Sequence, residues 1–134
     1  MLSKKNQYAL KALSYLAGRH EKGIISISEI AEKKKIPIKF LESILLQLKQ
    51  QGYLDSKKGK GGGYFLAKHP KEISLADIIR TIDGPIAMIP CVSLYFYEKC
   101  HDCQERTCKI NKVFIEARDA TLKILEGKTL HDIA

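Results

Sequence analysis

The chain has 134 residues, of which 45% are hydrophobic, which is enough for one compact domain with an appended helix or hinge region. No run of about 18 apolar residues occurs, so we expect no membrane span, and the N-terminus lacks the pattern of a secretory signal. We therefore expect a cytoplasmic protein whose thiols stay reduced.

The net charge of +8 is concentrated in one half of the chain. Residues 1–70 carry 14 Lys or Arg against 5 Asp or Glu, whereas residues 71–134 carry 9 against 10. Such an asymmetry favours a polyanionic partner, nucleic acid first, although a merely soluble basic surface is an alternative. A membrane surface would call for Trp or Phe anchors on a basic amphipathic helix, and the chain contains no Trp.

The first half of the chain predicts three helices. Apolar residues at helical spacing indicate a helix over residues 6–20. Ser26 and Glu29 form a predicted capping box at the start of a short helix that ends near residue 34, and a proline begins a longer helix over residues 37–51. Two helices joined by a short turn are typical of a helix-turn-helix, although an ordinary helical hairpin has the same pattern.

A basic, glycine-rich hairpin follows these helices. Two short strands are predicted over residues 53–57 and 64–68, around the loop Lys58-Gly-Lys-Gly-Gly-Gly. Glycine lets the backbone approach a phosphate closely, and lysine adds charge that releases counterions from a duplex. A hairpin of this kind after a helix-turn-helix predicts a wing that reaches the DNA backbone or minor groove.

Two further helices are predicted in the second half. Ser74 and Asp77 cap a helix that stops at Gly84. A long helix over residues 109–126 carries an apolar stripe formed by Ile110, Val113, Phe114, Ala117, Thr121 and Ile124. The simplest way to bury this stripe is against a partner helix, and packing against the same chain is the alternative.

The sequence thus predicts a mainly α fold with a small β-hairpin wing: a winged helix-turn-helix followed by a long C-terminal dimerisation helix. The predicted divisions are a DNA-binding domain over 1–84, a cysteine-rich sensor loop over 85–108, and a dimerisation helix with a C-terminal tail over 109–134.

All four cysteines fall within eighteen residues, in the spacing C-x8-C-x2-C-x4-C. They are Cys91, Cys100, Cys103 and Cys108. Thiols crowded in an intracellular chain favour a metal site or a redox centre over structural disulfides. Thiolates suit an iron–sulfur cluster, four of them also suit zinc, and nearby Arg106 and Lys109 would favour a metal-free thiol–disulfide switch.

Five segments are informative when taken together: Tyr8-Ala9-Leu10, Ile30-Ala31-Glu32, Phe40-Leu41-Glu42, the wing from Ser56 to Tyr64, and Ile78-Ile79 followed by Asp83-Gly84. With these segments the chain resembles the Rrf-type family of bacterial winged-helix regulators. The resemblance covers nearly the whole chain, and the wing is its most specific part. It implies a homodimer whose long C-terminal helices cross and whose two winged helices bind a palindromic operator in double-stranded DNA.

The resemblance also suggests which residues contact DNA. We predict contacts from the two helices and the wing, by Ser28, Lys39, Phe40, Glu42, Ser43, Lys57, Lys58, Lys60, Gly61 and Gly62. In similar proteins a glutamate at position 42 helps to select the operator, because a carboxylate accepts from a cytosine amine and repels phosphate. Lys58 stands where similar proteins more often have arginine. A lysine cannot make the bidentate base contact that an arginine could make there.

Cluster-binding relatives use three cysteines and one further ligand, and Cys108 matches the last of the three. Where such relatives place a histidine or an aspartate ligand, this chain has Asn111 and Gln7, neither of which is a good iron ligand. The fourth cysteine can complete the set. We therefore predict a 2Fe-2S or 4Fe-4S cluster, with zinc as the alternative, on Cys91, Cys100, Cys103 and Cys108.

The predicted function is a DNA-binding transcription regulator, a repressor, whose operator affinity depends on the cluster or redox state of the four-cysteine loop. The alternatives are a zinc-stabilised or thiol-switch regulator, a small iron–sulfur redox protein, and a winged-helix module that binds proteins. No catalytic triad, H-E-x-x-H motif or phosphate-binding loop occurs, so no enzyme is expected.

Overall fold

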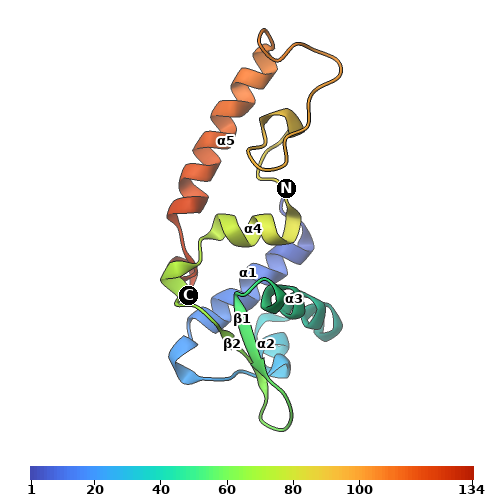
Figure 1. The fold of residues 1–134 in the computed structure, drawn as a ribbon. Helices are drawn as coiled ribbons and strands as arrows, with labels where there is room; N and C mark the ends of the chain where they lie inside the picture. Colours follow the sequence, from blue (N-terminus) through green and yellow to red (C-terminus); the bar gives the residue numbers. More distant parts are fainter.

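The computed structural model describes residues 1–134 as a helical head from which a long helix and a loop project (Figure 1). The regular elements of the head are α1 (Lys4–Ala17), α2 (Ile27–Lys34), α3 (Ile38–Gln50), β1 (Leu54–Lys57), β2 (Gly63–Leu66) and α4 (Leu75–Asp83). We call residues 1–84 and 128–134 the head, and residues 85–127, which include α5 (Lys109–Gly127), the arm.

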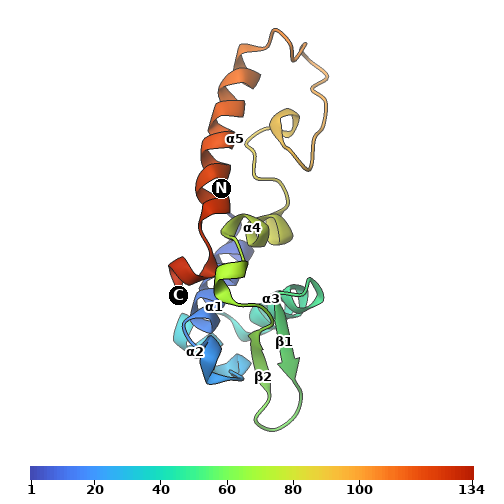
Figure 2. The ribbon, with the colours of Figure 1, turned by 60° about the vertical axis from the view of Figure 1, so that its left-hand side comes forward.

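The arm and the hairpin lie at opposite ends of the molecule in both views (Figures 1 and 2). The five main helices and the two-stranded antiparallel sheet confirm the predicted mainly α fold with a small β hairpin. None of the helices is sufficiently long and apolar to cross a membrane.

The helices of the head share one apolar core. Its largest fully buried side chains are Leu13, Leu16, Ile30, Leu41, Ile44, Leu45, Leu48, Ile73, Ile78 and Leu130. The four from α3 recur at the spacing of one helical face, as predicted. Burying a side chain of this size stabilises the fold by about 1.5–3 kcal/mol, so α3 is held firmly by its apolar side while the other side faces solvent.

The start of α2 differs from the prediction in one bond. The Ser26 hydroxyl accepts the Glu29 backbone N–H at 3.1 Å, as expected of a cap. Glu29 does not reach back to complete a capping box, because its carboxylate accepts a hydrogen bond from the buried Tyr15 hydroxyl at 2.6 Å. This bond joins α1 to α2. Pro37 precedes α3 as its cap residue instead of lying in its first turn.

The wing is anchored by a segment that the sequence did not identify. Ile25, just before α2, exchanges two backbone hydrogen bonds with Tyr64 in β2, at 2.9 and 2.8 Å. A Cβ atom at Gly63 would lie 2.1 Å from the Ile25 carbonyl oxygen, so this close approach requires glycine. Strand β2 is therefore held from both sides, by β1 and by Ile25.

The C-terminal tail returns to the head after α5. Leu130 begins a short 3-10 helix and is fully buried, and its N–H donates to the Ile73 carbonyl at 3.0 Å. The Ser14 hydroxyl donates to the Ile133 carbonyl, which ties the tail to α1. The last residues therefore complete the core of the head. The three divisions at 1–84, 85–108 and 109–134 stay predictions.

Candidate nucleic-acid interface and cysteine site

The start of α3 presents polar side chains to solvent. Lys39, Glu42 and Ser43 are exposed, as is Ser28 on α2. A turn of three residues separates α2 from α3, and the buried leucines and isoleucine of α3 lie on its other side. The helix-turn-helix therefore offers these four predicted contact residues to a partner.

Phe40 is the exception among the predicted contacts on α3. It is half-buried, and its ring packs edge-on against Tyr8 of α1, with 5.5 Å between ring centroids. This packing anchors the start of α3 to α1, so that Phe40 supports the position of its exposed neighbours.

The wing presents Lys57, Lys58, Lys60 and Gly61 to solvent. Gly62 is half-buried, and a Cβ atom there would lie 2.2 Å from the Lys57 carbonyl oxygen. Only glycine therefore lets the backbone approach closely enough to close the hairpin. The wing is also fixed relative to the end of α3, because the Lys49 ammonium donates to the Ser56 hydroxyl at 2.6 Å.

The lysines of the head carry no ion pair. The three ion pairs of the structure, Arg80–Asp77, Arg80–Glu126 and Arg118–Asp119, all lie within residues 77–126. The positive charge of residues 1–70 is therefore not neutralised by neighbouring carboxylates in salt bridges. Such a surface can exchange its counterions for the phosphates of a nucleic acid.

The four cysteines occupy the arm between α4 and α5. All are free thiols, of which Cys103 is exposed and the other three are half-buried. Cys108 caps α5, and its sulfur accepts the Asn111 backbone N–H at 3.3 Å. The side-chain Nδ2 of Asn111 donates to the sulfur of Cys91 at 3.4 Å. One residue thus connects the first and last cysteines of the motif.

The other thiols lie close enough to affect one another. Hydrogen bonding with the Cys100 thiol, together with burial and the Cys108 thiol, raises the pKa of Cys103 to about 12. The Asn111 backbone N–H lowers the pKa of Cys108 below that of an ordinary thiol. Cys100, Cys103 and Cys108 are therefore neighbours, although no three His, Cys, Asp or Glu side chains are arranged as a metal site.

The donor set fits the cofactor that the sequence predicts. Four thiols in one loop, with N–H donors at the start of a helix, are the chemistry of iron–sulfur ligation, and the same four sulfurs suit zinc. His101, the only histidine between the cysteines, is exposed, as expected of a solvated loop residue.

One face of α5 holds the cysteine loop. The Arg118 guanidinium donates to the Val92 carbonyl at 2.8 Å, one residue after Cys91. Asn111, Arg118 and the buried Leu122 recur at helical spacing, so they lie on the same side of α5. The apolar stripe is the clearest pattern in the sequence of α5, and the sequence indicates the polar face only by Asn111 and Arg118, seven positions apart.

The predicted apolar stripe is on a different side of α5 and is largely uncovered. Ile110, Val113 and Ile124 are 63%, 59% and 62% exposed. The chain itself therefore does not bury these three side chains. Exposed apolar surface of this kind is typical of an interaction site.

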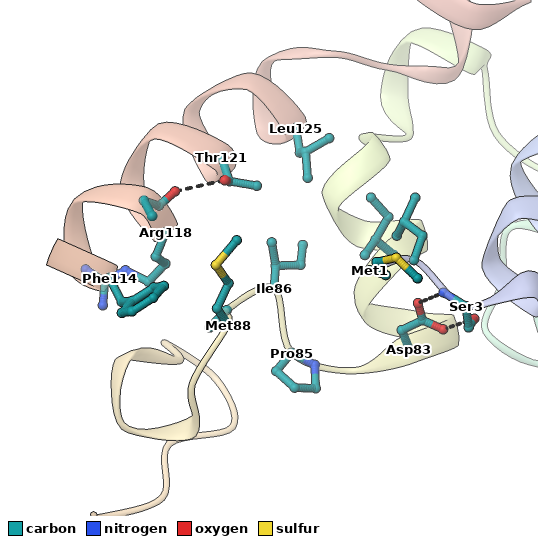
Figure 3. Close-up of a pocket in the computed structure, with 14 residues that line it drawn as sticks. Met1, Ser3, Asp83, Pro85, Ile86, Met88, Phe114, Arg118, Thr121 and Leu125 are labelled. Atoms are coloured by element: carbon teal, nitrogen blue, oxygen red, sulfur yellow. Dashed lines mark hydrogen bonds between the residues drawn. The ribbon is translucent and has the colours of Figure 1, made fainter. Parts of the chain in front are cut away.

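A cavity of about 570 Å³ opens beside α5 (Figure 3). Phe114 and Leu125 of α5 line it together with Ile86 and Met88 of the arm, and the N-terminus closes its other end. The polar groups at its edge have partners within the chain: Ser3 donates to Asp83, and Arg118 donates to Val92. The cavity is thus mainly apolar.

The family model of the iron-dependent transcriptional regulator Rrf2 matches residues 2–134. The chain is 42% identical over 137 residues to an rrf2-like HTH-type transcriptional regulator of Rhodobacter capsulatus, covering 99% of this chain and 91% of that protein. The structure of the present chain is similar to that of CymR, the global cysteine regulator of B. subtilis. The TM-score is 0.83 and the sequence identity 30%, over 100% of this chain and 95% of CymR.

The structure of T. potens IscR is also similar, with a TM-score of 0.77 and 26% identity, over 99% of this chain and 85% of the other. These relatives confirm the winged-helix assignment, and they are regulators, not enzymes. The chain belongs to the Rrf2 family of DNA-binding transcriptional regulators.

Proposed function

We propose that this regulator binds a palindromic operator as a homodimer in the cytoplasm, as a repressor, and that the four-cysteine loop controls its operator affinity by holding an iron–sulfur cluster. One observation carries the proposal: Cys108 caps α5, the helix whose exposed apolar side chains are free to contact a second copy. A change in the loop can therefore alter how two heads are spaced.

The DNA contacts would come from the two exposed parts of the head. Lys39, Glu42 and Ser43 at the start of α3 suit the major groove, and the lysines of the wing suit the phosphate backbone. The absence of salt bridges to these lysines supports the proposal. Ser28, Gly61 and Gly62 would add contacts beside them, whereas Phe40 would act by holding α3 in place.

The cluster would be held by Cys91, Cys100, Cys103 and Cys108. When bound, an iron–sulfur cluster supplies a centre that responds to iron supply and to oxidants. The chain's own residues connect this loop to α5: Cys108 caps the helix, and Asn111 and Arg118 hold the loop against it. Ordering or loosening the loop would then shift the population of dimer arrangements that fit the operator.

A metal-free thiol switch is the second candidate, and one observation favours it. The Asn111 backbone N–H lowers the pKa of Cys108, which favours its reactive thiolate, and the exposed Cys103 thiol interacts with Cys108 and is a partner for a disulfide once Cys108 has reacted with an oxidant. Zinc on the same four sulfurs is the third possibility.

The cluster is tested by iron and sulfide analysis of anaerobically purified protein, with Cys103→Ala as the variant. We expect brown wild-type protein, and loss of visible absorption in the variant. Stoichiometric zinc in colourless protein would support the zinc alternative instead. If wild-type protein and a variant with all four cysteines replaced by serine bind the same operator equally under every iron and oxidant condition, the sensing proposal is wrong.

The DNA interface is tested by gel shifts at several salt concentrations. The expected effect of Lys58→Ala or Lys60→Ala is weaker binding to every sequence, with a salt slope smaller by about 1 for each lost phosphate contact. Lys123→Ala, an exposed lysine of α5, is the matched control and should leave the slope unchanged. Equal slopes for all three variants would contradict the assigned role of the wing.

A further inference from the structure

Asn111 occupies an unusual place for a side chain that is a poor metal ligand. It is 6% exposed, it lies in the first turn of α5, and it contacts two of the four cysteines. Burial of a carboxamide is unfavourable unless its polar atoms are bonded, so the contact with Cys91 is needed to offset that cost.

The two bonds of Asn111 come from different parts of the residue. Its backbone N–H donates to Cys108, three residues earlier, and this bond is available to any residue at that position except proline. Its side-chain Nδ2 donates to Cys91, twenty residues away in sequence. Of these two bonds, only the one from the side chain bears on where Cys91 lies relative to α5.

We propose that Asn111 is a positioning residue of the cysteine site: through these two bonds it fixes the sulfurs of Cys91 and Cys108 relative to each other before any metal is bound. The inference deepens the proposed function. With the two outermost cysteines fixed, the loop has fewer conformations to sample before all four sulfurs can bind one metal centre. A donor held in place in this way loses less conformational entropy when the metal binds.

Arg118 assists from the next part of the same helical face. Its bond to the Val92 carbonyl holds the backbone beside Cys91, and Val92 itself is buried. Asn111 fixes the sulfur and Arg118 fixes the backbone, so that Cys91 is constrained at both ends of its side chain.

The first test uses reduced, metal-free protein. In Asn111→Leu the side chain keeps its branched shape and cannot donate a hydrogen bond or bind metal, while the backbone bond to Cys108 remains. The amides of Val92 and Ser93, which bond to the carbonyls of Ile89 and Pro90, report opening of the loop. We expect them to exchange hydrogen about fivefold faster in the variant, the change that one modest hydrogen bond supports.

Gln104→Leu is the matched control, because it removes an exposed carboxamide from the same loop. It should leave the exchange at Val92 and Ser93 unchanged, and the amides in the middle of α5 should be unchanged in both variants. Exchange in Asn111→Leu that equals that of wild-type protein would overturn the proposal.

The second test measures cobalt(II) binding by its thiolate absorption bands. Loss of a residue that orients ligands typically weakens metal binding by about 10- to 100-fold, which is the effect expected for Asn111→Leu and not for Gln104→Leu. Equal cobalt affinity in wild-type and Asn111→Leu protein would overturn the positioning role. If the loop exchanges faster in Asn111→Leu but wild-type protein binds no metal, Asn111 does position the cysteines, and the proposed metal site is wrong.

Discussion

Two carboxylates hold the ends of the chain in place. Asp83, at the end of α4, accepts the Ser3 backbone N–H at 3.0 Å and also the Ser3 hydroxyl. Asp132, in the C-terminal tail, accepts the Thr129 backbone N–H at 2.8 Å. Although burial raises the pKa of Asp83, the hydrogen bonds from Ser3 keep it below its ordinary value. Each bond is made to the ionised carboxylate, so each end of the chain depends on the protonation state of its own aspartate.

The Thr129 N–H lowers the pKa of Asp132 from its ordinary value of 3.8. Because the pKa is lower in the folded chain, the ionised carboxylate stabilises the fold above that value, and this stabilisation is lost as the pH falls through the folded-state pKa. We expect the stability of Asp132→Asn to fall less steeply between neutral and acidic pH than that of wild-type protein, as measured by urea unfolding. Asp102→Asn, in the exposed part of the loop, is the control; parallel curves for Asp132→Asn and wild type would refute the expectation.

At the scale of the elements, the wing depends on a close backbone approach. Gly63 faces the Ile25 carbonyl, and the two bonds between Ile25 and Tyr64 hold the hairpin against the segment before α2. The position of the wing lysines is therefore coupled to the position of the helix-turn-helix. Without the bonds to Ile25, β1 and β2 would form an isolated two-stranded hairpin, which is marginally stable in water.

The substitution Gly63→Ala tests this coupling. Its methyl group would overlap the Ile25 carbonyl, so we expect a loss of about 1–3 kcal/mol in the free energy of unfolding, together with weaker operator binding. Gly127→Ala is the control, because a Cβ atom at position 127 meets nothing within 4 Å. Urea unfolding and gel shifts measure both effects. A Gly63→Ala variant as stable as wild type would show that the backbone can move without cost.

Across the whole molecule, the cysteine loop lies far from the wing, because the arm and the hairpin are at opposite ends (Figure 2). The connections between the arm and the head include the packing of α5 on α4, with the Arg80–Glu126 ion pair, and the stacking of the Arg80 guanidinium over the Tyr95 ring. The tail also returns to the head through Leu130. A signal from the cysteines can pass through such contacts or through a second copy.

The dimer is tested at this scale by Val113→Glu. The substitution places a charge in the exposed apolar stripe of α5, and burying that charge against a partner helix is unfavourable. We expect the variant to sediment as a monomer and to bind a palindromic operator more weakly. Lys123→Glu, elsewhere on the exposed surface of α5, is the control for charge alone. A Val113→Glu protein that sediments as wild type would place the interface elsewhere.

The sequence by itself determined the helices, the hairpin and the family. Caps such as Ser26 and Ser74, and the spacing of Leu41, Ile44 and Leu48, act within one or two turns, so the order of residues is sufficient to predict them. The glycine-rich wing and the grouped cysteines are also local patterns. Their residue types predicted the chemistry of each site before any contact was known.

The tertiary structure alone decided how distant segments meet. The bond from Tyr15 to Glu29, the pairing of Ile25 with Tyr64, the burial of Leu130 and the contact between Asn111 and Cys91 join residues that periodicity does not relate. Such contacts depend on which surfaces pack together in three dimensions. For that reason the side of α5 that holds the cysteine loop became visible only in the folded chain.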